Sequence, residues 1–238
     1  MHNRGLRSNW LRRQQLLMAC VVLAALSATR SSCASELSPT PQPSESRAIV
    51  VLGDSLTAGY GLDRRQAYPA LLQQKINAEG WNFTVLNAGQ SGDTTADGLR
   101  RIDWLLQRRI HVLIVALGGN DGLRGIDPDA TRANLQAIID HARQKYADIR
   151  IVLAGMAMPP NLGKDYVNSF RAIYPDLAKQ NQVALIPFLL EGVGGRPDSN
   201  QDDMIHPTAE GQKVVADNVW RVLRPLLLAM MRITPSAP

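Results

Sequence analysis

Five short, mainly apolar runs alternate with helical patterns between residues 48 and 228, and this alternation limits the fold more than any other feature. The runs occupy residues 48–52, 83–86, 112–117, 149–154 and 183–186. None of them alternates regularly between apolar and polar residues, so we expect each to be a strand buried on both faces. Such strands, separated by helices, predict one α/β domain: a three-layer sandwich with a parallel sheet between two layers of helices.

The helices are predicted from apolar residues that recur at helical spacing. The first covers Tyr68 to Asn77, with Pro69 in its first turn and Gly80 closing it. Further helices are expected around residues 99–106, after Asp127, around residues 167–178, and after His206-Pro207. We find no internal repeat and no break in composition that would mark a second domain.

The first 34 residues have the order of a secretory signal peptide. Four arginines precede an apolar run at residues 16–28, and Ser32-Cys33-Ala34 offers a small-residue cleavage site. We therefore predict a signal peptide at 1–34, a flexible Pro/Ser-rich linker at 35–47, a folded domain at 48–230 and a disordered tail at 231–238. The expected location is the periplasm of a Gram-negative bacterium, or the medium. An uncleaved anchor and lipidation of Cys33 are the alternatives, although Arg30 stands where a lipidation signal has an aliphatic residue.

The charge of the chain is concentrated in this leader. The whole chain has a formal net charge of +5, and the leader contains five arginines and no acidic residue, so the remainder is neutral. A nucleic-acid partner is therefore not expected. Both cysteines, Cys20 and Cys33, also lie in the leader. The mature chain consequently has no thiolate to act as a nucleophile or a metal ligand.

Polar residues follow the ends of the predicted strands, where ligands bind in open α/β sheets. Ser55 comes directly after the first strand, in Gly53-Asp54-Ser55, and is a candidate nucleophile unless this is an ordinary polar turn. His206 precedes the last predicted helix and is the candidate base. Asp203, three residues earlier, is the candidate that orients the imidazole, with Asp202 as its rival.

Two further residues are candidates for stabilising an oxyanion. Gly92 would donate a backbone N–H and Asn120 a side-chain amide. Taken alone, each also fits a common turn or a helix cap. A metal site at Asp202, Asp203 and His206 is disfavoured, because zinc sites usually require more nitrogen or sulfur ligands.

Taken together, four segments resemble the sequence blocks of the GDSL, or SGNH, hydrolases and occur in that family's order. They are residues 53–56 (GDSL), 87–94 (NAGQSGDT), 118–121 (GGND) and 203–207 (DMIHP). The resemblance implies that Ser55 is the nucleophile, His206 the base and Asp203 its orienting acid. It also implies that the Ser55 amide, Gly92 and Asn120 form the oxyanion hole. The family's fold is a five-stranded, flavodoxin-like parallel sheet in the order 2-1-3-4-5.

Residues 117–125 and 201–207 are most similar to the family's group of bacterial periplasmic thioesterases, lysophospholipases and arylesterases. This implies cleavage of carboxylic esters and acyl thioesters, with lysophospholipids as further candidates, by a monomer without cofactor, metal or lasting membrane anchor. Leu123, Met156 and Pro159 are expected to bind the acyl group. The site loops also offer the apolar residues Ile126, Met158, Pro160 and Leu162.

Two other functions compete with this reading. A carbohydrate O-acetylesterase on the same fold would be expected to present more aromatic platforms than a chain with 5% aromatic residues offers. A non-catalytic binding domain would not need a complete set of Ser, Gly, Asn, Asp and His.

Overall fold

The computed structural model describes residues 46–233. The predicted signal peptide, most of the predicted linker and residues 234–238 of the predicted tail lie outside the described residues. Two boundaries differ by a few residues from those expected. Strand β1 already begins at Arg47, in the predicted linker, and the last helix includes residues 231–233 of the predicted tail.

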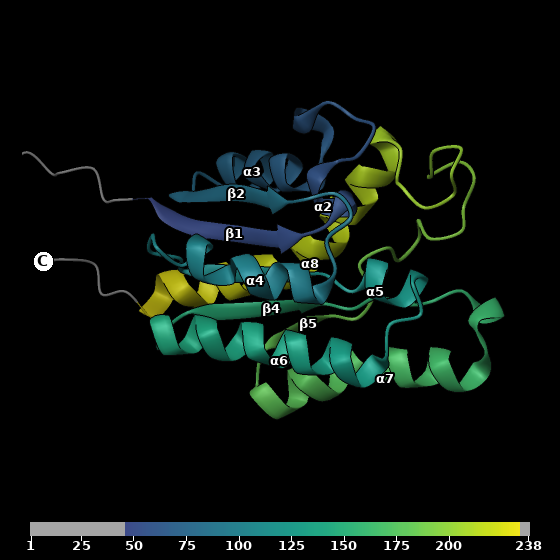
Figure 1. Cartoon of the computed structure of the whole chain (residues 1–238). Helices are drawn as coiled ribbons and strands as arrows, with labels where there is room; N and C mark the ends of the chain where they lie inside the picture. The colour runs from purple at the N-terminus through teal and green to yellow at the C-terminus, as the bar shows by residue number, and fades with distance from the viewer. Residues whose placement is uncertain (1–45, 234–238) are drawn as a thin grey trace, which may run out of the picture. The chain divides into compact units, whose positions relative to one another are not determined.

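A single parallel sheet of five strands organises the described residues (Figure 1). In spatial order the strands are β2 (Phe83–Gly89), β1 (Arg47–Gly53), β3 (Val112–Ala116), β4 (Arg150–Ala154) and β5 (Ala184–Ile186). Every pair of neighbours is parallel, with Leu52 opposite both Ala88 and Val115. The predicted order, 2-1-3-4-5, is confirmed.

Helices cover both faces of this sheet. One face carries α3 (Tyr68–Ala78) and α8 (Ala209–Ile233), which pack against each other. The other face carries α4 (Thr95–Leu105), α6 (Pro128–Lys145) and α7 (Lys164–Asn181), with α6 between its two neighbours. Four shorter elements were not predicted, because three to five residues are too few to show a period: α2 (Ser55–Ala58), α5 (Gly119–Leu123) and the 3₁₀ turns η1 (Arg64–Gln66) and η2 (Pro160–Leu162).

Burial follows the position of each strand in the sheet. All five residues of the central strand β3 are buried, as expected for a strand covered on both faces. Strand β2 is different: only Phe83 is fully buried, and Thr84 and Asn87 are exposed. The expectation of two buried faces is therefore wrong for β2, which lies at the edge of the sheet.

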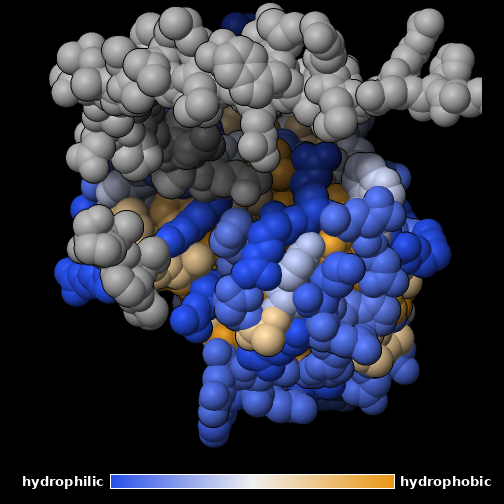
Figure 2. Space-filling view, turned by 90° about the vertical axis from the view of Figure 1, so that its left-hand side faces the viewer, coloured by the Kyte–Doolittle hydropathy of each residue, from blue (hydrophilic) through white to orange (hydrophobic). Residues whose placement is uncertain are grey.

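Because all strands are parallel, their carboxyl ends meet at one edge of the sheet, on the right in Figure 1. Figure 2 views the opposite end. Where described residues are visible there, the surface is mostly hydrophilic, with apolar residues in small separate areas. Within residues 46–233, no helix has both the length and the apolar character needed to cross a membrane.

Candidate active site

The turn after β1 places Ser55 at the carboxyl edge of the sheet. Asp54 is the N-cap of α2, and its Oδ1 accepts a hydrogen bond of 2.9 Å from the N–H of Leu56. Ser55 is the first residue of α2, so no earlier helical carbonyl accepts its N–H. The predicted polar turn is therefore also a cap that presents both the hydroxyl and the amide of Ser55.

Gly53 serves this turn through its small size. A Cβ at this position would lie 2.0 Å from Thr57 Oγ1 and 3.0 Å from the carbonyl of Ala116. Its φ angle is not in the left-handed region. Glycine at this position therefore permits the close approach of α2 and β3.

His206 joins Ser55 to Asp203. Its Nε2 lies 2.9 Å from Ser55 Oγ, and its Nδ1 lies 2.6 Å from Asp203 Oδ2. An ionised carboxylate only accepts hydrogen bonds, so the proton of the neutral imidazole belongs on Nδ1. Nε2 is then the acceptor that faces the serine hydroxyl. The structure thus brings these three predicted residues into one hydrogen-bonded chain.

Asp203 also organises the turn that carries His206. Its Oδ1 accepts backbone N–H bonds of 2.9 Å from both Ile205 and His206. These bonds, together with the imidazole, lower the pKa of Asp203 to about 2, the backbone bond from His206 being the largest cause. Asp202 is exposed and makes no hydrogen bond to His206, so the structure places Asp203 and not its rival against the imidazole.

Gln212 of α8 connects the helix that follows His206 to the turn that carries Ser55. Its buried side-chain amide donates to the carbonyl of Leu56 at 3.1 Å, and its carbonyl oxygen accepts the N–H of Tyr68 at 2.8 Å. The ring of Tyr60, from the loop after α2, lies 4.5 Å from that of His206. The helix that follows His206 is therefore held directly against α2.

The two predicted oxyanion donors lie on neighbouring loops. Asn120 is in α5, and its Nδ2 donates to the carbonyl of Asp93 at 2.9 Å. Gly92 precedes Asp93 and has a φ of 87°, a conformation that strongly favours glycine. Its carbonyl accepts a bond of 2.9 Å from the guanidinium of Arg124. The hydrogen bond to Asp93 thus links Asn120 to the loop of Gly92.

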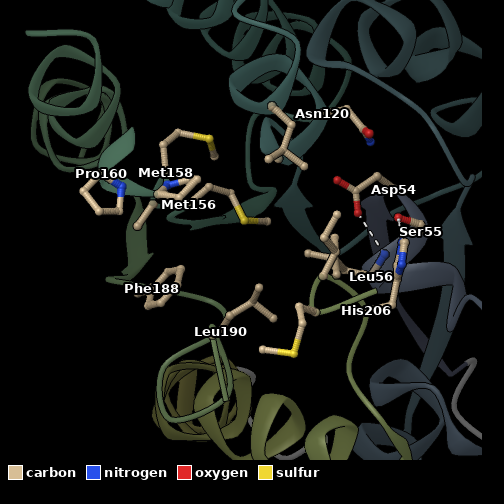
Figure 3. A pocket seen from close by; sticks show the side chains of 18 residues that line it. Asp54, Ser55, Leu56, Asn120, Met156, Met158, Pro160, Phe188, Leu190 and His206 are labelled. Carbon is tan, nitrogen blue, oxygen red and sulfur yellow. Dashed lines mark hydrogen bonds between the residues drawn. The ribbon is translucent and has the colours of Figure 1, made fainter. Parts of the chain in front are cut away.

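A cavity of about 510 Å³ lies beside Ser55 and His206 (Figure 3). The predicted residues Leu123, Met156 and Pro159 line it, together with Met158 and Pro160. Ile126 and Leu162 are not among the lining residues. Figure 3 shows Asp54, Ser55 and His206 at one end of the cavity and Pro160 and Phe188 toward the other. The arrangement is a mainly apolar cavity with the candidate nucleophile, Ser55, at one end.

Several lining residues were missed by the sequence analysis. They come from the first turns of α2 and α5, from the loop after β5 and from the turn before α8: Leu56, Gly119, Phe188, Leu190, Gly194, Gly195, Met204 and Ile205. A signal was available for Phe188 and Leu190, because they directly follow a predicted strand at the ligand-binding edge. Within the described residues, no group of three or more His, Cys, Asp or Glu side chains is arranged to hold a metal ion.

Asp54 is a second carboxyl group close to Ser55; unlike Asp203 it lines the cavity, and its environment differs from that of Asp203. It is 1% exposed, and burial raises its pKa from 3.8 to about 7 despite the hydrogen bond from Leu56. Sequence analysis gave Asp54 no role beyond the turn. The structure shows it as a largely buried acid next to the candidate nucleophile.

A family model described as "GDSL-like Lipase/Acylhydrolase family" matches residues 51–214. The chain is 42% identical over 187 residues to Esterase TesA of Pseudomonas aeruginosa, covering 78% of this chain and 92% of the relative. It is 42% identical over 180 residues to Thioesterase 1/protease 1/lysophospholipase L1 of Escherichia coli K12, covering 75% and 84%, respectively.

A solved structure described as the crystal structure of TesA is also similar. It superposes with a TM-score of 0.72 at 41% sequence identity, covering 76% of this chain and 99% of that one. The similarity therefore extends over nearly the whole of the matched protein.

Asp54 generates a prediction about stability and pH. The pKa of the Asp54 carboxyl group is higher in the folded chain than its unfolded value of 3.8. Such a group makes its full contribution to the stability of the folded state at pH values below the unfolded pKa. That contribution is lost as the pH rises toward 7. Asp54→Asn keeps the cap acceptor but cannot ionise, so between pH 5 and 8 the wild type should lose on the order of 2 kcal/mol of unfolding free energy relative to this variant. Urea unfolding at both pH values measures the difference.

Asp202→Asn is the matched control, since it removes an exposed carboxylate from the same end of the molecule. Its unfolding free energy should follow the wild type at both pH values. Equal changes in the Asp54→Asn variant and the wild type would contradict the assignment of a buried, readily protonated acid.

Proposed function

The chain belongs to the GDSL-like lipase/acylhydrolase family, and we propose that this serine ester hydrolase uses Ser55 as nucleophile, His206 as general base and Asp203 as the orienting carboxylate. The observation that carries the proposal is the unbroken hydrogen-bonded chain from Asp203 through His206 to Ser55, at one end of an apolar cavity. A non-catalytic binding domain would not require this chain.

Acylation starts with proton transfer. His206 Nε2 takes the proton of the Ser55 hydroxyl while Oγ bonds to the carbonyl carbon of the substrate. Asp203 holds the imidazole in the required tautomer and stabilises the imidazolium that forms. The tetrahedral intermediate then breaks its bond to the alcohol or thiol, which leaves with the proton from His206. Ser55 remains as an acyl ester.

Deacylation repeats these steps with water as the nucleophile. His206 takes a proton from the water as its oxygen bonds to the acyl carbon, and then returns a proton to Ser55 Oγ as the acid departs. In both halves the oxyanion is stabilised by the N–H groups of Ser55 and Gly92 and by the amide of Asn120. Asn120 has two amide hydrogens, so its bond to Asp93 leaves one for the substrate.

The cavity supports acyl esters and thioesters as substrates. Its lining is dominated by aliphatic, Met and Pro side chains, with Leu123, Met156 and Pro159 as proposed acyl contacts. Flexible Met side chains adapt to several acyl shapes. The relatives named as an esterase and as a thioesterase and lysophospholipase support the same substrates. A carbohydrate acetylesterase is less supported: among the described lining residues, Phe188 supplies the single aromatic ring.

The location and assembly state are also part of the proposal. We infer that residues 1–34 direct export and are removed, leaving a periplasmic or secreted monomer without a lasting membrane anchor. The support is the order of basic, apolar and small residues in the leader.

The catalytic roles are tested by Ser55→Ala and His206→Ala. Each should lower kcat by roughly 10⁴–10⁶, because the two side chains serve one proton transfer. The double variant should be little worse than either single variant. Steady-state kinetics on p-nitrophenyl hexanoate measures this, and an organophosphate should label Ser55. Near-normal turnover by the Ser55→Ala variant would overturn the proposal.

Asp203→Asn and Asp202→Asn provide the matched comparison within one turn. Only Asp203 bonds to His206, so its variant should lose much more activity. The reverse ranking would assign the orienting role to Asp202.

Substrate choice should follow the apolar lining. Each buried methylene contributes about 0.8 kcal/mol, so kcat/KM should rise as the acyl chain lengthens from two carbons and level off when the cavity is full. A panel of p-nitrophenyl esters, acyl-CoAs, lysophospholipids and acetylated sugars measures this with the purified mature protein. Faster cleavage of acetylated xylan than of every hexanoyl or longer ester would favour the carbohydrate esterase instead.

Export should produce a chain that begins at Ser35. N-terminal sequencing of protein from an osmotic-shock fraction tests the cleavage site. A chain that still begins at Met1 in the membrane pellet would indicate an anchor, and a diacylglyceryl group on Cys33 would indicate a lipoprotein.

A further inference from the structure

The three proposed oxyanion donors, Ser55, Gly92 and Asn120, belong to three separate segments that follow β1, β2 and β3. Some feature must therefore fix the positions of these donors relative to one another. We propose that the ion pair between Arg101 and Asp93 is this feature, and that Arg101 is a positioning residue for the oxyanion hole. The inference rests on the proposed function, since it assigns Arg101 a part in the same reaction.

Asp93 connects two of the donors. It directly follows Gly92, and its backbone carbonyl accepts the 2.9 Å bond from Asn120 Nδ2. The residue is buried, and its side chain points to Arg101, whose Nε lies 2.7 Å from Oδ2. Any displacement of Asp93 therefore moves the Gly92 amide and changes the position of the Asn120 amide as well.

Arg101 connects this loop to the third donor. Arg101 lies in α4, and a different nitrogen of its guanidinium, Nη2, donates a hydrogen bond of 2.9 Å to the carbonyl of Gly53. Gly53 ends β1, two residues before Ser55, and its carbonyl also accepts the N–H of Gln90 at 3.0 Å. One planar guanidinium thus spans the serine turn and the Gly92 loop. Lysine has no rigid fork with which to make both bonds in the same geometry.

The pair is largely shielded from water, with side-chain exposures of 20% for Arg101 and 6% for Asp93. Without Arg101, the Asp93 carboxylate would lose its cation in a region of low dielectric and turn toward solvent. Because Asp93 is covalently joined to Gly92, we expect the oxyanion donors to shift with it. Misplacement of this kind reduces the rate of the chemical step more than ground-state binding.

Arg100 offers a matched control on the same helix. It pairs with Asp97, but its side chain is 71% exposed and makes no described hydrogen bond to the loops of the site. Arg100→Lys therefore changes, and Arg100→Met removes, an ion pair on α4 without touching the oxyanion donors.

The experiment measures kcat and KM for p-nitrophenyl hexanoate, together with the melting temperature, for Arg101→Lys, Arg101→Met and the two Arg100 variants. Both Arg101 variants should lose roughly 10- to 100-fold in kcat with KM changed by less than about threefold. The Arg100 variants should retain normal kcat. A second measurement places Arg101→Lys in an Asn120→Ala background. There the further loss in kcat should be smaller, because one of the positioned donors is already absent.

A purely structural role would lower the melting temperature of the Arg101 variants while kcat per folded enzyme stayed normal, and this result would overturn the proposal. If Arg101→Met does not fold, Arg101→Lys and the charge-neutral double variant Asp93→Asn/Arg101→Gln take its place. Failure of all three to fold would also overturn the proposal. Failure of the proposed function is distinguishable, since it would appear as activity in the Ser55→Ala variant.

Discussion

The hydrogen bond between Ser55 and His206 joins residues 151 positions apart, and the rest of the architecture is arranged so that it can form. Ser55 stands at the end of β1, which lies inside the sheet between β2 and β3. His206 precedes α8, which packs on the same face as α3 and is tied to α2 through Gln212. A parallel sheet is what allows this closure, because its strand ends and the loops after them share one edge.

The fold was largely predictable because buried parallel strands are uniformly apolar, a pattern that is visible in residues 48–52 and 112–117. The pairing of Asp203 with His206 was also accessible, since the two are three residues apart. What could not be predicted depends on contacts between distant segments. The spacing of Arg101 does not reveal that its guanidinium reaches the carbonyl of Gly53. Phe188, by contrast, was accessible to prediction, because it directly follows a predicted strand at the ligand-binding edge of the sheet.

Two aspartates of the site have pKa values shifted in opposite directions by different causes. The pKa of Asp203 is lowered to about 2, chiefly by hydrogen bonds from backbone N–H groups and from the imidazole, which favour the charged form. The pKa of Asp54 is raised to about 7 by burial, although the hydrogen bond from the N–H of Leu56 favours the charged form. Consequently, between about pH 2 and pH 7 the carboxylate that bonds the imidazole is charged while Asp54 is mainly neutral. An imidazolium at His206 would interact chiefly with Asp203, whose Oδ2 lies 2.6 Å from Nδ1.

The chemistry and the selection of the acyl group are supplied by different parts of the chain. The proposed nucleophile, base and oxyanion donors come from the loops after β1, β2 and β3 and from the turn before α8, and hydrogen bonds connect these segments. Half of the residues that line the cavity come from the loops after β4 and β5, where Met156, Met158, Phe188 and Leu190 contribute apolar surface. Gly122 allows α5 to pack closely against this wall, because a Cβ at that position would lie 2.0 Å from the sulfur of Met158. Side chains in the wall can therefore change the shape of the cavity without breaking a hydrogen bond between Asp203, His206 and Ser55, so the proposed catalytic arrangement is physically separate from the surface proposed to select the acyl group.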